Sequence, residues 1–125
     1  MEKKILVIDD DPDFVTSTAI VLRSRGYQVL EALSGKEGLE LSKKEKPDLY
    51  LVDLMMETYG EGIKLADALD KDEYAKDKPR IMITSLSIQG PWGTYSDHQK
   101  VSFDLVLQKP VSPETLLKTV EKVLA

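Results

Sequence analysis

The stretch Leu49-Tyr50-Leu51-Val52-Asp53 decides the fold of this chain. Its four consecutive apolar residues are typical of a strand that is buried on both faces, as strands are in a parallel sheet. The run ends on a carboxylate, and an ionised aspartate at the end of a buried strand is costly unless it has partners or a chemical task. We therefore expect the rest of the chain to supply partners for Asp53.

Working outward from this strand, further apolar runs of strand length lie on either side of it, at residues 5–8, 27–32, 81–83 and 105–107. Helical patterns separate the runs. Asp11 and Pro12 form a typical helix start, Gly26 a typical helix end, and Ser34 with Glu37 a capping box for a second helix. The first half of the chain thus alternates strand and helix.

The second half continues the alternation. A third helix is expected after a loop over residues 54–62, and a last helix begins at Ser112. Between them, the sequence Gly-Pro-Trp-Gly at residues 90–93 excludes a regular helix, so the fourth helix is expected to be short or irregular. The whole pattern predicts an α/β domain with a five-stranded parallel sheet and helices on both faces.

Composition limits the class of protein. The chain has 125 residues, of which 42% are hydrophobic, a net charge of −5 and no cysteine. We expect one domain over residues 1–125, with no output domain. The negative charge argues against direct binding to nucleic acid, and the lack of cysteine excludes disulfide and thiol chemistry. No signal peptide or membrane-spanning run is visible, so we expect a cytoplasmic protein with no membrane partner.

Polar residues follow four of the expected strands: Asp9 and Asp10, Asp53, Thr84, and Lys109. The carboxyl ends of parallel strands converge on one crevice, where ligands bind in open α/β sheets. Clustered carboxylates repel one another unless a cation is present, and oxygen ligands favour Mg²⁺. A carboxylate can also attack phosphorus, while a metal, a lysine and a hydroxyl neutralise the phosphoryl oxygens. The set can therefore supply the nucleophile, the metal site and the charge clamp that phosphoryl transfer needs.

Four short motifs at these strand ends resemble the receiver domain of the two-component response regulators. They are IDDD at residues 8–11, VDLMM at 52–56, ITS at 83–85 and QKP at 108–110. Each motif alone is weakly specific, but all four occur in the right order with ordinary spacing, and the resemblance covers the whole chain. It implies the flavodoxin-like strand order 2-1-3-4-5, which is the order found in the chemotaxis regulator of the same family.

The resemblance implies a role for each matching residue. Asp53 matches the phospho-acceptor, Thr84 the hydroxyl that bonds a phosphoryl oxygen, and Lys109 the cation that pairs with the phosphoryl group. The peptide bond between Lys109 and Pro110 is cis in the family, which a proline bond makes accessible.

The same resemblance implies a magnesium site. Asp10 matches a direct ligand of Mg²⁺, and Asp9 a ligand that usually acts through water. Asp53 and the backbone carbonyl of Met55 are the other ligands that the resemblance implies. Mg²⁺ is accordingly the expected cofactor.

Some positions depart from the family pattern. Val106 stands at the switch position that usually holds an aromatic residue, and an aliphatic side chain cannot rotate a ring between inward and outward positions. Glu57 replaces a frequent proline. Met55 and Leu86 flank the phosphoryl site in the family, and both are apolar here, so neither can orient an attacking water. This predicts slow loss of the phosphoryl group.

The function implied is a phosphorylation-switched signalling module, which catalyses only its own phosphorylation and dephosphorylation. Its partners would be a sensor histidine kinase or a histidine phosphotransfer protein and an unidentified downstream protein. It would act as a monomer or as a dimer linked to phosphorylation. Two alternatives remain open. One is a pseudo-receiver that binds proteins without switching. The other is an enzyme of the haloacid dehalogenase type, against which Asp13 stands where that family has Thr or Val.

Overall fold

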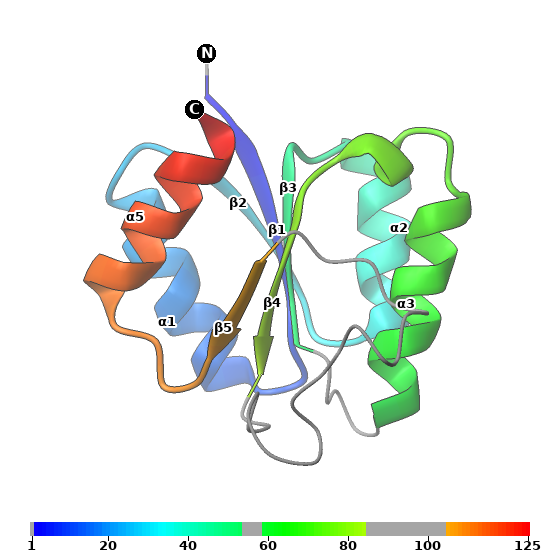
Figure 1. Cartoon of the computed structure of the whole chain (residues 1–125), viewed down its shortest axis with the longest axis horizontal. Helices are drawn as coiled ribbons and strands as arrows, with labels where there is room; N and C mark the ends of the chain where they lie inside the picture. The colour runs from blue at the N-terminus through cyan, green and yellow to red at the C-terminus, as the bar shows by residue number, and fades with distance from the viewer. Residues whose placement is uncertain (1, 54–58, 85–104) are drawn as a thin grey trace.

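The computed structural model of the chain describes residues 2–53, 59–84 and 105–125. Its helices and strands alternate along the chain (Figure 1). In order they are β1 (Lys4–Ile8), α1 (Pro12–Arg23), β2 (Gln28–Ala32), α2 (Gly35–Glu45), β3 (Leu49–Val52), α3 (Tyr59–Lys71), the 3₁₀ turn η1 (Ala75–Asp77), β4 (Arg80–Thr84), β5 (Leu105–Gln108) and α5 (Pro113–Leu124).

The five strands form one parallel sheet with the order β2-β1-β3-β4-β5. The expected α/β class and the strand order 2-1-3-4-5 are therefore confirmed. In this order β1 and β3 are neighbours, with Ile8 opposite Val52, so the residues that follow the two strands emerge side by side. The fourth helix, expected to be short or irregular, lies outside the described residues.

Helices cover both faces of the sheet, with α1 and α5 on one side and α2 and α3 on the other (Figure 1). Strand β1 shows how the sequence divides between the two cores. Ile5 and Val7 pack with α1 and α5, whereas Leu6 and Ile8 pack with α2 and α3. Because side chains alternate along a strand, an unbroken apolar run is required to fill both layers.

The helix ends follow the local chemistry expected from the sequence. The side chain of Asp11 accepts a hydrogen bond from the Asp13 N–H at 3.0 Å, and that of Ser34 accepts one from the Glu37 N–H at 3.1 Å. Each bond satisfies a donor that the first helical turn leaves open. After α1, Gly26 adopts a φ of 87°, a left-handed conformation that favours glycine.

The start of α3 differs from the sequence-based prediction, which is wrong at this point. The sequence predicts a loop up to residue 62, but α3 begins at Tyr59 and includes two glycines in its first turn. Each glycine costs a helix about 1 kcal/mol relative to alanine. Leu65, Ala66 and Leu69 of the same helix are buried against the sheet, and this packing outweighs the local preference.

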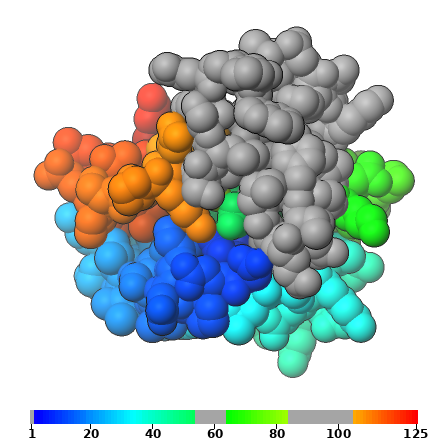
Figure 2. All heavy atoms as spheres, turned by 90° about the horizontal axis from the view of Figure 1, so that it is seen from below, coloured from blue at the N-terminus to red at the C-terminus, as the bar shows by residue number. Residues whose placement is uncertain are grey.

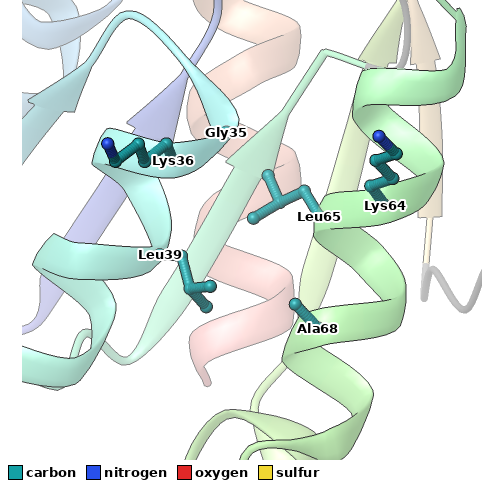
Figure 3. A pocket seen from close by; sticks show the side chains of 6 residues that line it. All are labelled: Gly35, Lys36, Leu39, Lys64, Leu65 and Ala68. Carbon is teal, nitrogen blue, oxygen red and sulfur yellow. The ribbon is translucent and has the colours of Figure 1, made fainter.

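Helices α2 and α3 also contact each other. Figure 3 shows Leu39 of α2 and Leu65 of α3 pointing toward each other across a shallow cleft of about 310 Å³, with Lys36 and Lys64 at its rim. Because Gly38 has no Cβ, α2 can pack closely against β1. A Cβ at this position would lie 2.5 Å from Ile8 Cδ1. Among the described residues, no helix is long and apolar enough to cross a membrane.

Candidate functional site

Two buried carboxylates lie at the carboxyl edge of the sheet, directly after β1 and β3. Asp9 donates its N–H to Ala32 O at 3.1 Å, and Asp53 donates its N–H to Ile8 O at 3.0 Å. These backbone bonds continue the sheet ladder by one residue and fix both side chains at its edge. Asp9 is 1% exposed and Asp53 is 6% exposed. Burial of two acids this close together demands compensation by cations or hydrogen-bond donors.

Asp10 completes a cluster of three acids with Asp9 and Asp53. It lies on the exposed side of the cluster, and each of the three residues offers an oxygen within 4.8 Å of the others. Mg²⁺ holds oxygen ligands at about 2.0–2.1 Å and usually retains several waters. The donor set therefore fits this ion, with waters completing its shell.

Lys109 reaches this cluster from the loop after β5. Figure 2 looks onto this edge of the molecule, where the first residues of α1 (blue) lie beside the segment that follows β5 (orange). Lys109 Nζ lies 2.7 Å from Asp9 Oδ2 and 3.4 Å from Asp53 Oδ2. The peptide bond to Pro110 is cis, as the family resemblance implies. One ammonium group thus bridges both buried carboxylates.

The electrostatics of the pair follow from burial and from this contact. Burial is the largest cause of the shift in the pKa of the Asp9 carboxyl, and it raises this pKa. The hydrogen bonds from Lys109 and from the Asp11 N–H lower the same pKa, but the net shift is upward. Burial lowers the pKa of Lys109, but the hydrogen bond to Asp9 and the charges of Asp53 and Asp9 outweigh it. The net effect raises the pKa of Lys109, so its ammonium stays protonated at neutral pH.

The structure brings together four of the residues predicted from the sequence: Asp9, Asp10, Asp53 and Lys109. The backbone of Thr84 ends β4 opposite Gln108, the residue before Lys109, which places it at the same edge of the sheet. The side chain of Thr84 is not among the described parts.

Of the remaining predicted residues, the structure describes only Val106. Met55 and Leu86, expected to flank the phosphoryl group, lie outside the described residues, as do Glu57 and the segment 90–93. Val106 is half-buried in β5 opposite Met82. Its role as an aliphatic switch position stays a prediction.

Sequence reasoning missed two features of the site. It expected Lys109 to serve Asp53, but the shorter of its two contacts is with Asp9. It also did not single out Phe14, whereas Lys109 Nζ lies 4.2 Å from the centre of the Phe14 ring. Nothing in the local sequence signals a contact between residues this far apart in the chain.

Comparisons with known proteins agree with the geometry. Residues 5–121 match the family model described as response regulator receiver domain. Protein PilH of Pseudomonas aeruginosa is 35% identical over 124 residues, and the match covers 98% of each chain. The phosphate regulon transcriptional regulatory protein PhoB of the same organism is 34% identical, and the match covers 98% of this chain and 52% of PhoB. This chain therefore spans about half the length of PhoB.

A solved structure shows the same likeness. The chemotaxis response regulator CheY4 of Vibrio cholerae superimposes with a TM-score of 0.86 and 28% sequence identity. The superposition covers 98% of this chain and 99% of that one.

Proposed function

This chain belongs to the family of response regulator receiver domains, and on that premise we propose that Asp53 accepts a phosphoryl group from a phosphohistidine of a partner protein. Receiver domains are regulatory modules of two-component signalling rather than enzymes with a separate substrate. The observation that carries the proposal is the position of the Lys109 ammonium between the buried carboxylates of Asp9 and Asp53.

In the proposed step, a carboxylate oxygen of Asp53 attacks the phosphorus of the phosphohistidine. An O–P bond forms as the N–P bond breaks, and its electron pair goes to the imidazole nitrogen, which is then protonated from solvent. In the transition state, negative charge is spread over the three equatorial phosphoryl oxygens, where a preorganised cation can stabilise it. Lys109 supplies that cation from 3.4 Å away, and the hydroxyl of Thr84 is proposed to donate to another phosphoryl oxygen.

Mg²⁺ is the proposed cofactor, held by Asp10, Asp53, the backbone carbonyl of Met55 and, through water, Asp9. When bound, it would neutralise charge on the phosphoryl oxygens. The indirect role of Asp9 is supported by its present partners, because Oδ1 accepts the Asp11 N–H at 3.0 Å and Oδ2 accepts Lys109. Both oxygens of Asp9 are already engaged, and Asp10 is the exposed residue of the cluster.

The surface beside Lys109 supports delivery of the phosphoryl group by a protein. Phe14, Pro110 and Val111 line an open, largely apolar cavity of about 460 Å³ together with Lys109. An apolar surface next to a reactive group is suited to docking another protein. A sensor histidine kinase or a histidine phosphotransfer protein is the proposed donor. The phosphorylated module would then bind a downstream protein, with Val106 at the position where the family places its aromatic switch.

The phosphoryl group is proposed to be lost slowly, because Met55 and Leu86 are apolar and cannot orient an attacking water. We expect the phosphorylated chain, after removal of the donor, to persist for much longer than seconds. Complete return to the unmodified mass within seconds would contradict this expectation.

The experiment that tests the proposed function is the intact mass of the full chain after incubation with Mg²⁺ and a small phosphodonor such as phosphoramidate. We expect the addition of one phosphoryl group, and none in Asp53→Asn, whose amide is a far weaker nucleophile than a carboxylate. Asp13→Asn is the matched control, because Asp13 is an exposed acid of the first turn of α1. It should be modified as the unaltered chain is.

Two further assays, of Mg²⁺ binding and of phosphate release from an unrelated phosphomonoester, separate the alternatives. A chain that neither binds Mg²⁺ nor gains mass would be a pseudo-receiver, acting only as an interaction module. Sustained release of phosphate from an unrelated phosphomonoester, with turnover, would instead indicate an enzyme of the haloacid dehalogenase type.

A further inference from the structure

The aromatic ring of Phe14 forms one wall of the space that holds the Lys109 ammonium. Lys109 Nζ lies 4.2 Å from the centre of this ring, 2.7 Å from Asp9 Oδ2 and 3.4 Å from Asp53 Oδ2. The three contacts come from the first turn of α1 and from the residues that follow β1 and β3. Among these contacts of the described residues, the ring is neutral and the two carboxylates are charged, and the side chain of Lys109 remains 19% exposed.

A ring at this distance attracts an ammonium group through its quadrupole, and the attraction is strongest where water is excluded. Lysine has a long, flexible stem and a strongly hydrated head, so it needs such contacts to stay in one place. The carboxylates compete with water for the ammonium, whereas the ring closes one approach of water to it.

The ring contact also differs in kind from the two ion pairs. Moving the ammonium from Asp9 toward a phosphoryl group on Asp53 breaks one directional hydrogen bond and forms another. The attraction to the ring operates over about 6 Å and needs no donor–acceptor alignment. It can therefore persist while Lys109 changes partners.

We propose that Phe14 is a positioning residue for phosphorylation, because its ring holds the Lys109 ammonium at the carboxylate cluster before and during transfer. This inference rests on the proposed function, and it extends that function to a residue outside the carboxylate cluster. Phe14 also packs against the core between α1 and the sheet, so the test must separate positioning from stability.

Two variants of the full chain separate the effect of the aromatic ring from the effect of side-chain volume. Phe14→Tyr keeps the aromatic face on a half-buried side chain that lines an open cavity. Phe14→Leu keeps apolar bulk but removes the face. With saturating Mg²⁺ and phosphoramidate, we expect Phe14→Leu to lower the phosphorylation rate constant about threefold to tenfold, and Phe14→Tyr to stay within about twofold of the unaltered chain.

Nuclear magnetic resonance gives a readout that a purely structural role would not change. The methylene protons next to Lys109 Nζ lie near the ring face, so we expect ring-current shifts upfield in the unaltered chain and in Phe14→Tyr, and their loss in Phe14→Leu. Val123→Ala is the stability control, because Val123 packs against the same core from the last turn of α5. It should alter neither the rate nor the Lys109 signals.

Equal rates and equal Lys109 signals in the unaltered chain and Phe14→Leu would overturn the proposal. So would a Phe14→Tyr variant as slow as Phe14→Leu, or a Val123→Ala variant slowed to the same degree. The resonance comparison needs no phosphorylation, so it decides whether the ring holds Lys109 even if the proposed function fails.

Discussion

At the scale of single residues, the described part of the site is a balance between the buried acids Asp9 and Asp53 and the cation Lys109. Asp9 is almost fully buried, and both of its oxygens accept hydrogen bonds, from Lys109 and from the Asp11 N–H. A buried carboxylate that loses its cation is left with an uncompensated charge, which costs more than the loss of an exposed ion pair. We therefore expect Lys109 to contribute to stability as well as to the proposed phosphoryl transfer.

The first prediction concerns this cation. Lys109→Met should lower the free energy of unfolding at pH 7 by about 1–3 kcal/mol, less than for a fully buried pair because Lys109 is partly exposed. Urea unfolding measures the change. Lys118→Met, which removes an exposed lysine of α5, is the control and should be nearly neutral. Equal stability of the two variants would show that Lys109 does not compensate the buried acids.

A second prediction at this scale concerns Tyr50, which is completely buried in β3 and hydrogen-bonded to Ser42. Burial is the main cause that raises the pKa of Tyr50 to about 12, against the bond to Ser42, which lowers it. Between pH 10 and pH 12 the unfolded chain loses this proton while the folded chain keeps it. Stability is therefore lost as pH rises through this window.

Tyrosinate absorbance and urea unfolding measure this effect. We expect one of the tyrosines to titrate near pH 12, and Tyr50→Phe to remove that step. The unaltered chain should lose about 2–3 kcal/mol more stability than Tyr50→Phe across the window. Parallel loss of stability in both proteins would contradict the assignment to Tyr50.

At the scale of elements, close packing decides where the helices lie. Gly38 of α2 rests on β1, and an added Cβ would meet Ile8 Cδ1 at 2.5 Å and Cγ1 at 2.8 Å. In an exposed helix, replacing glycine by alanine stabilises by about 1 kcal/mol. At Gly38 the clash with Ile8 should make the same replacement destabilising.

The third prediction is that Gly38→Ala lowers the free energy of unfolding by about 1–3 kcal/mol, because α2 must move away from the sheet. Ile8→Val removes the nearest contacting atom, so it should cost less in the Gly38→Ala background than alone. A thermal unfolding cycle of the four proteins measures this coupling. Additive effects would mean that Gly38 and Ile8 do not contact each other as described.

Most elements could be predicted from the sequence because their signals are local. The apolar runs of β1 and β3 form the strands themselves. The helix caps lie directly before the helices that they start; they are Asp11, Ser34 and Ser112. The start of α3 and the turn η1 could not be predicted in this way. Tertiary packing extends α3 through two glycines, and no local pattern indicates η1.

At the scale of the whole molecule, the strand order of the sheet brings the residues of the site together. Asp9, Asp53 and Lys109 meet because β1 and β3 are neighbours and β5 ends at the same edge. The motifs predicted which residues would gather there. They could not predict that Lys109 lies nearer Asp9 than Asp53, or that Phe14 covers it, because these distances depend on packing between segments that lie far apart in the chain.

The fourth prediction concerns the metal. A ligand that binds only the folded state stabilises that state, and the stabilisation grows with the logarithm of the ratio of ligand concentration to dissociation constant. Added Mg²⁺ should therefore raise the melting temperature of the unaltered chain, and a chelator should reverse the effect. Asp10→Asn should abolish the shift, while Asp13→Asn should retain it. A shift that persists in Asp10→Asn would place the ion elsewhere.

The most direct test of the central claim is the phosphorus-31 resonance spectrum of the full chain with Mg²⁺ and phosphoramidate. The proposed function predicts one new resonance at an acyl phosphate position, present in the unaltered chain, weaker in Lys109→Met and absent from Asp53→Asn. No acyl phosphate in the unaltered chain, or one that persists in Asp53→Asn, would contradict the claim that Asp53 accepts the phosphoryl group.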